Sequence, residues 1–276
     1  MALTGISYVA IALLGLVFGS FFNVAIYRWP QEDRQQREWI INPSHCPHCG
    51  ARIRPYDNIP LLSFILLRGR CRDCHAAISW RYPAVEAGTA MLWLLTAWAV
   101  TRFGLSGLAP QQLSLWHVVF AIFFASLYLL TIIIDFQTSI IPDEINVAHL
   151  VGAWLFMWVC HGATLSPSWQ SSLIGMFVLS AFFLVLALFG GMGFGDAKLA
   201  VGMGALFGWP LIVATGFIGV LLGGIVAITL LIVLKAQGRY KRHIPIPFGP
   251  YLALAGFICM FRGHELVSWY LRLFHL

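Results

Sequence analysis

Charged side chains are scarce in this chain. Only 10% of its 276 residues are Asp, Glu, Lys or Arg, 59% are hydrophobic, and the mean hydropathy is +0.81. A soluble domain has about 25% charged residues, so this composition excludes an ordinary soluble protein. It predicts an all-α polytopic membrane protein of about eight transmembrane helices, with one small polar insertion.

Acidic residues are scarcest after residue 86. From there to the end the acids are Asp135, Asp143, Glu144, Asp196 and Glu265. Asp135 directly follows the apolar run 116–134, and Asp196 comes shortly after the run 173–189. An ionisable group within a bilayer costs about 2–3 kcal/mol or more, so such a group indicates a functional site. We therefore take Asp135 and Asp196 as the candidate catalytic residues.

The chain also lacks internal repeats, low-complexity tracts and a glycine-rich dinucleotide-binding loop. The missing repeat counts against a proton-coupled membrane transporter, which is the main competing hypothesis for a protein with intramembrane acids. A non-enzymatic component of a membrane assembly would also fit such a chain, as would a membrane protease.

Positive charge is concentrated in two segments. Nine of the 17 Lys and Arg residues lie between Arg28 and Arg81, and four lie between Lys235 and Arg242. Basic loops stay in the cytoplasm, so this bias predicts a cytoplasmic 28–82 segment and an N-terminus outside. The same charges would contact membrane lipids, and they give no reason to expect nucleic acid as a partner.

Apolar segments divide the chain into three regions: a first transmembrane helix at 1–27, a cytoplasmic insertion at 28–82 and a transmembrane helical bundle at 83–276. The break between the sixth and seventh spans rests on Gly208-Trp209-Pro210. Counting spans from the cytoplasmic insertion puts Asp135 and Asp196 at the same face of the membrane. The predicted spans are 5–26, 83–101, 115–134, 145–162, 171–189, 197–209, 211–234 and 248–262.

Four of the six cysteines form two C-x2-C pairs in the insertion. They are Cys46, Cys49, Cys71 and Cys74, and about twenty residues separate the pairs. This pattern is typical of a closed structural site for Zn2+, whereas free or redox-active thiols are the alternative. The insertion has few large apolar residues, so a metal ion would supply folding free energy that it lacks.

Glycines surround the second aspartate. Gly193 and Gly195 flank Phe194 just before Asp196, and they would let an extended backbone approach the acid. Two nearby carboxyls share a proton, which suits hydrolysis by an activated water. Lys198 is expected to tune Asp196 or to face headgroups, and Asp143 is a reserve candidate. Taken singly, Asp135 fits a helix-end acid and Asp196 fits a helix N-cap.

These residues resemble the type IV prepilin leader peptidases, the bacterial GxGD-type membrane aspartic proteases that also serve type II secretion pseudopilins. Their order and spacing along the chain carry the resemblance. The matching segments are 19–28 (GSFFNVAIYR), both C-x2-C pairs, 56–60 (YDNIP), 78–83 (ISWRYP), Glu86, Asp135, 141–143 (IPD), 193–196 (GFGD) and 247–251 (PFGPY).

The resemblance implies eight spans in the bacterial inner membrane, with Asp135 and Asp196 catalytic at the cytoplasmic face. It implies cleavage of a basic leader from prepilins or pseudopilins, typically after a glycine and before a phenylalanine. It further implies methylation of the new N-terminal amine with S-adenosylmethionine, since family members with the tetracysteine insertion are generally bifunctional. No motif in the sequence locates the S-adenosylmethionine site, and Glu86 is the residue named as a candidate for it.

Overall fold

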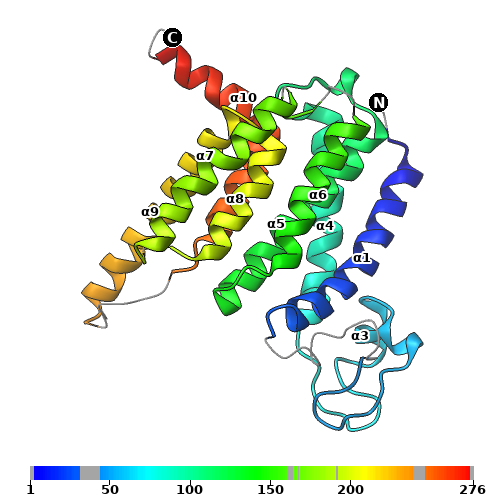
Figure 1. Ribbon diagram of the computed structural model, residues 1–276. Helices are drawn as coiled ribbons and strands as arrows, with labels where there is room; N and C mark the ends of the chain where they lie inside the picture. Colours follow the sequence, from blue (N-terminus) through cyan, green and yellow to red (C-terminus); the bar gives the residue numbers. More distant parts are fainter. Residues whose placement is uncertain are drawn as a thin grey trace. The chain divides into compact units, whose positions relative to one another are not determined.

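The structure is a computed structural model that describes residues 3–31, 44–160, 164–166, 168–190, 192–238 and 246–273. Within these residues the regular secondary structure is helical, and strand pairing is limited to isolated bridges. The α-helices in Figure 1 are α1 (Gly5–Arg28), α3 (Leu62–Leu66), α4 (Arg81–Phe103), α5 (Leu115–Thr138), α6 (Asp143–Val159), α7 (Trp169–Leu188), α8 (Phe194–Phe207), α9 (Leu211–Ala236) and α10 (Gly249–Leu273).

Five of these helices are long and apolar enough to cross a membrane: α1, α4, α5, α7 and α9. The predicted all-helical membrane class is therefore confirmed, whereas the count of eight spans is not. A helix coincides with each of the remaining three predicted spans, but α6 has 17 residues and α8 has 14. The predicted break at Gly208-Trp209-Pro210 matches the gap between α8 and α9.

The chain divides into two compact units, residues 2–96 and residues 97–276, with the division inside α4. In the first unit, α1 packs against the beginning of α4 through two glycines. A Cβ built at Gly15 would lie 2.7 Å from Cα of Ala90, and one at Gly19 would lie 2.6 Å from Cα of Glu86. Only residues without a side chain allow backbones to approach this closely.

Helix α8 is enclosed by its neighbours in the second unit. Its residues Ala200, Met203 and Ala205 have no exposed surface. A Cβ built at Gly204 would lie 2.7 Å from the backbone nitrogen of Met176 in α7, so these two helices touch through their backbones. By contrast, α9 exposes large apolar side chains such as Phe217, as expected of a helix that faces lipid.

Helices α6 and α8 run parallel and start at the same end of the second unit. The segment before α6 contacts the start of α8, because Ile141 lies against Gly195. Further along the two helices, Asp143 at the start of α6 contacts Lys198 of α8. About two turns later, Cβ of His149 in α6 lies 2.6 Å from a Cβ built at Gly202 in α8. Helix α5 ends where α6 begins, so its last turn also lies at this end (Figure 1).

Candidate active site and metal centre

Asp135 lies in the last turn of α5 and is only 4% exposed. Helix α5 ends just beyond it, at Ser139, whose φ of 54° is left-handed. The first residue of α10, Gly249, faces the carboxyl group. A Cβ built at Gly249 would lie 2.7 Å from Oδ2 of Asp135. The carboxyl is thus enclosed by the starting turn of another helix.

Asp196 lies in the first turn of α8 and is 7% exposed. The N-cap of α8 is Gly193, so the interpretation of Asp196 as the N-cap is wrong. The backbone N–H of Asp196 instead donates to the carbonyl of Gly193 at 3.2 Å. Gly195 packs closely, since a Cβ built there would lie 3.2 Å from Cβ of Ile141.

The structure brings the two aspartates together at one end of the second unit. Ile141 contacts both Gly195, which precedes Asp196, and Gly249, which faces Asp135. The carboxyls of Asp135 and Asp196 interact electrostatically. Within the described part of the chain, Oδ2 of Asp135 and Oδ1 of Asp196 are buried and accept no hydrogen bond. An acceptor on each carboxyl is therefore available to a water molecule or a substrate.

Lys198 and Asp143 form an ion pair with each other beside the aspartates. Nζ of Lys198 lies 2.7 Å from Oδ1 of Asp143, and the two side chains are 54% and 67% exposed. Lys198 is thus paired with Asp143, and this solvated pair differs from the buried surroundings of Asp135 and Asp196. Both residues remain candidates for a supporting role at the rim of the site.

Gly249 and Ile141 contribute to the site in ways that the sequence did not reveal. Both lie in segments, 247–251 and 141–143, that entered the argument only through the resemblance. The residue type of Gly249, for example, gives no indication that it contacts the carboxyl of Asp135, which lies 114 residues earlier in the chain. The usable signal was a glycine directly before a proline at a helix start, which points to a close approach of backbone.

Four cysteine Sγ atoms converge in the insertion of the first unit. Those of Cys46, Cys49, Cys71 and Cys74 all lie within 4.8 Å of one another. A tetrahedral zinc ion with Zn–S bonds of about 2.3 Å requires Sγ atoms about 3.8 Å apart. The separation of Cys46 and Cys74 is 3.9 Å, so the donor set fits the ion.

Two similar turns hold these cysteines. Ala51 and Ala76 each accept a hydrogen bond from the backbone N–H of the first cysteine of a pair, Cys46 and Cys71. Backbone N–H groups of Cys49 and His48 lower the pKa of Cys46 to about 6. A thiolate is the form that binds a metal ion, so the turn prepares this ligand.

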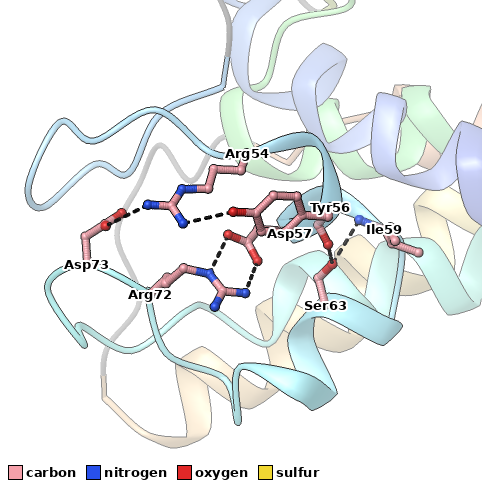
Figure 2. A network of polar contacts seen from close by, with 7 residues as sticks. All are labelled: Arg54, Tyr56, Asp57, Ile59, Ser63, Arg72 and Asp73. Carbon is pink, nitrogen blue, oxygen red and sulfur yellow. Dashed lines mark hydrogen bonds and ion pairs between the residues drawn. The ribbon is translucent and has the colours of Figure 1, made fainter.

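A polar network ties the second cysteine turn to the segment between the pairs (Figure 2). The guanidinium of Arg72 binds both carboxyl oxygens of Asp57, with Nε 2.8 Å from Oδ2. Arg54 donates to Oη of Tyr56 at 2.9 Å and lies 4.0 Å from Asp73. These acids therefore balance neighbouring arginines.

A cavity of about 770 Å³ lies within the first unit, between the insertion and the facing ends of α1 and α4. Its lining includes Asn23, Arg28, Tyr82 and Glu86. Glu86 is buried and accepts a hydrogen bond of 2.8 Å from the backbone of Leu61. Asn23 donates to the carbonyl of Tyr82 at 3.1 Å, and its Oδ1 accepts no hydrogen bond from any described residue. The size is typical of a small-molecule pocket.

These features define a class: helical membrane proteins with a buried carboxyl pair in one unit and a four-cysteine centre in another. A family profile described as "Bacterial Peptidase A24 N-terminal domain" matches residues 13–100, and the profile "Type IV leader peptidase family" matches residues 121–228. The second match contains both aspartates.

Relatives match over nearly the whole chain. Proteins named "Prepilin leader peptidase/N-methyltransferase" from Aeromonas hydrophila and Pseudomonas aeruginosa are each 34% identical to this chain, over 95% and 94% of it and over 93% and 92% of their own lengths. A protein of the same name from Legionella pneumophila is 32% identical over 96% of this chain and 94% of its own length. The chain therefore belongs to the type IV leader peptidase family. No solved structure matches it.

Proposed function

We propose that the protein is a membrane aspartic endopeptidase that removes the basic leader of type IV prepilins or type II secretion pseudopilins. The observation that carries this proposal is the pairing of Asp135 and Asp196, which are both buried and each keep an oxygen without a partner. One carboxylate takes a proton from a water molecule, and the other, protonated, polarises the scissile carbonyl. Family membership and the names of the relatives support the same reaction.

The substrate would be held in an extended form beside the start of α8. A peptide bond within a helix hides its carbonyl in the helix's own hydrogen bonds, so cleavage needs an opened segment. Gly193 leaves open space beside Asp196, because the nearest atom to a Cβ built at Gly193 is Oδ2 of Asp196 at 3.4 Å. The resemblance indicates cleavage after a glycine and before a phenylalanine.

The topology that suits this reaction has eight spans in the bacterial inner membrane. It adds α6, α8 and α10 to the five helices of spanning length, and it puts the N-terminus outside. The basic residues of the insertion and of the 235–242 segment then lie on the cytoplasmic side, as the charge rule requires. The aspartates share that side, where the basic leader of a substrate would remain.

We also propose that the protein methylates the new N-terminal amine with S-adenosylmethionine, as the names of its relatives indicate. The 770 Å³ cavity of the first unit is the best candidate site for this methyl donor. Buried Glu86 suits the ribose hydroxyls or the ammonium group, and Oδ1 of Asn23 is an acceptor for the adenine amine. The bound donor supplies the methyl group, and these residues would only bind and orient it.

Zn2+ is proposed as the structural ion of the four-cysteine centre. All four ligands are thiolates, which leaves no open position for substrate and argues for a purely structural role. Because the C-x2-C turns also line the proposed methyl-donor cavity, metal binding would shape that cavity.

A single assay tests both activities: incubation with a model prepilin and labelled S-adenosylmethionine, followed by mass spectrometry of the mature N-terminus. Asp135→Asn and Asp196→Asn should abolish cleavage while membrane insertion is unchanged, because an amide neither takes the proton nor shares it. Glu265→Gln, which changes an exposed acid of α10 paired with Arg262, is the matched control and should retain cleavage. Full processing by either dyad variant would refute the proposed mechanism.

A further inference from the structure

Three more polar side chains are buried in the second unit without hydrogen-bond partners. They are Tyr128 of α5 and both Asn146 and His149 of α6. Tyr128 is 1% exposed and His149 has no exposed surface. No described residue bonds the Tyr128 hydroxyl, either ring nitrogen of His149 or either amide atom of Asn146.

Tyr128 lies deeper in the bundle than the aspartates but in line with one of them. It precedes Asp135 by seven residues, or two helical turns, on the same face of α5. Helix α10 repeats this register: Gly249 faces the Asp135 carboxyl, and Gly256, seven residues later, would place a Cβ 2.9 Å from Oη of Tyr128. Both polar groups of α5 therefore face the same neighbouring helix.

Asn146 and His149 connect this deeper level with α8. The rings of His149 and Tyr128 have centroids 5.0 Å apart. Gly202, six residues after Asp196 in α8, lies against both α6 residues: a Cβ there would be 3.4 Å from the carbonyl oxygen of Asn146. Because α6 and α8 run parallel from the aspartate end, Asn146 lies between the level of Asp196 and the level of His149.

Unpaired polar groups buried in a helical bundle lower the stability of the fold. A buried donor or acceptor without a partner loses the hydrogen bonds that it made to water in the unfolded chain. Further close neighbours of Tyr128 and His149 include Phe124 and the methyl of Met203, which offer no partner. Buried waters typically make about three hydrogen bonds to just such groups.

We propose that Tyr128, Asn146 and His149 bind a chain of internal water molecules that runs from the aspartate pair about two turns into the bundle. The ligand of this site is water, and the three residues are positioning residues, since they reach the aspartates only through it. The site also supplies partners for the unpaired oxygens of Asp135 and Asp196.

The role of this water rests on the proposed peptidase function. Each cleavage consumes one water molecule: its oxygen bonds to the carbonyl carbon, the C–N bond breaks, and a proton goes to the leaving amine. A substrate whose apolar segment covers the aspartates would shut out bulk water, so stored water beneath them would serve the hydrolysis.

Radiolytic hydroxyl-radical labelling of the full chain in lipid nanodiscs, without substrate, tests the water site itself. Radicals formed from bound water label adjacent side chains even where bulk solvent is absent. Tyr128 should be labelled well above Phe183 and Phe207, which are also buried aromatic residues of this unit and serve as controls. Asn146→Leu and His149→Leu should each lower that labelling. Labelling of Tyr128 at the level of the two phenylalanines would overturn the proposal.

Thermal unfolding and kinetics of the same variants give a second readout. If water bridges these groups, Tyr128→Phe and Asn146→Leu should lower Tm, and kcat for a model prepilin should fall severalfold at unchanged KM. His149→Gln, which keeps a polar group, should retain more activity than His149→Leu, and Val147→Leu on the exposed face of α6 should behave like the unchanged protein. A raised Tm in the apolar variants would mean that the site is dry. If Tyr128 is labelled but the protein has no peptidase activity, the water site stands and only the proposed function is rejected.

Discussion

Gly249 lies directly against the carboxyl group of Asp135. A Cβ built on it would sit 2.7 Å from Oδ2 and 2.9 Å from Cδ1 of Ile141, so no larger residue fits without displacing one of them. The contact joins the end of α5 to the start of α10, two elements 114 residues apart. The packing of the Asp135 carboxyl thus depends on a glycine, which has no side chain.

Gly249→Ala should therefore lower kcat for a model prepilin by about tenfold to a hundredfold, as expected when a reacting group is displaced by about 1 Å. The added methyl group would displace the Asp135 carboxyl relative to the carboxyl of Asp196. Gly224→Ala in α9 is the matched control, since a Cβ there meets nothing within 4 Å. Equal activity of the two variants in a peptide cleavage assay would contradict the role assigned to Gly249.

The Lys198–Asp143 pair should contribute little to the reaction. Lys198→Ala and Asp143→Asn are each expected to change kcat/KM by less than about fivefold, because exposed ion pairs are worth about 0–1 kcal/mol. Steady-state kinetics of the two single variants and the double variant would measure this. A loss as complete as that of Asp196→Asn would show that one of them acts within the site.

Cys46→Ser combined with Cys49→Ser should remove bound zinc and unfold the insertion, since two of four ligands are lost. Metal content by atomic emission spectroscopy and protease sensitivity of residues 44–80 are the measurements. Cys160→Ala, a buried cysteine outside the cluster, is the control and should keep one zinc per chain. Unchanged metal content in the double variant would rule out the four-thiolate centre.

The Asp57–Arg72 pair should make the stability of the insertion fall at acid pH. Hydrogen bonds from Arg72 hold the pKa of Asp57 below its ordinary value of about 3.9. A carboxyl with a lowered folded-state pKa stabilises the fold above the unfolded value, and this stability is lost as pH falls through the folded value.

Carboxyl carbon NMR titration of Asp57 should accordingly give a midpoint below about 3.9, and Arg72→Gln should raise that midpoint. Asp73, whose carboxyl lies 4.0 Å from Arg54 and is about half exposed, is the internal comparison. A titration of Asp57 that does not respond to Arg72→Gln would show that the pair is absent in solution.

Sequence alone predicted the elements that depend on local pattern. Long apolar runs predicted the helices, because a chain in lipid must satisfy its backbone within each segment. The spacing of Cys46, Cys49, Cys71 and Cys74 predicted a cluster, because two short turns suffice to converge four thiolates. Charge bias put Asp135 and Asp196 on the same side, and the structure has them at one end of one unit.

The rest depended on packing between distant segments. The contacts of Gly249 and Ile141 with the aspartate site arise from helix registers that no local pattern encodes. Likewise, the pairing of Lys198 with Asp143 instead of Asp196 follows from the parallel start of α6 and α8. The short length of α8, by contrast, was predicted: the sixth span was expected at 197–209 with a break at Gly208, and the helix has 14 residues.

The exposed ion pair of Lys198 and Asp143 lies only two residues along α8 from Asp196. In the proposed topology, this pair faces the cytoplasm, so a compound aimed at the two acids would arrive from the aqueous phase and need not first dissolve in the lipid. Inhibitor libraries for this enzyme can accordingly include charged, water-soluble molecules.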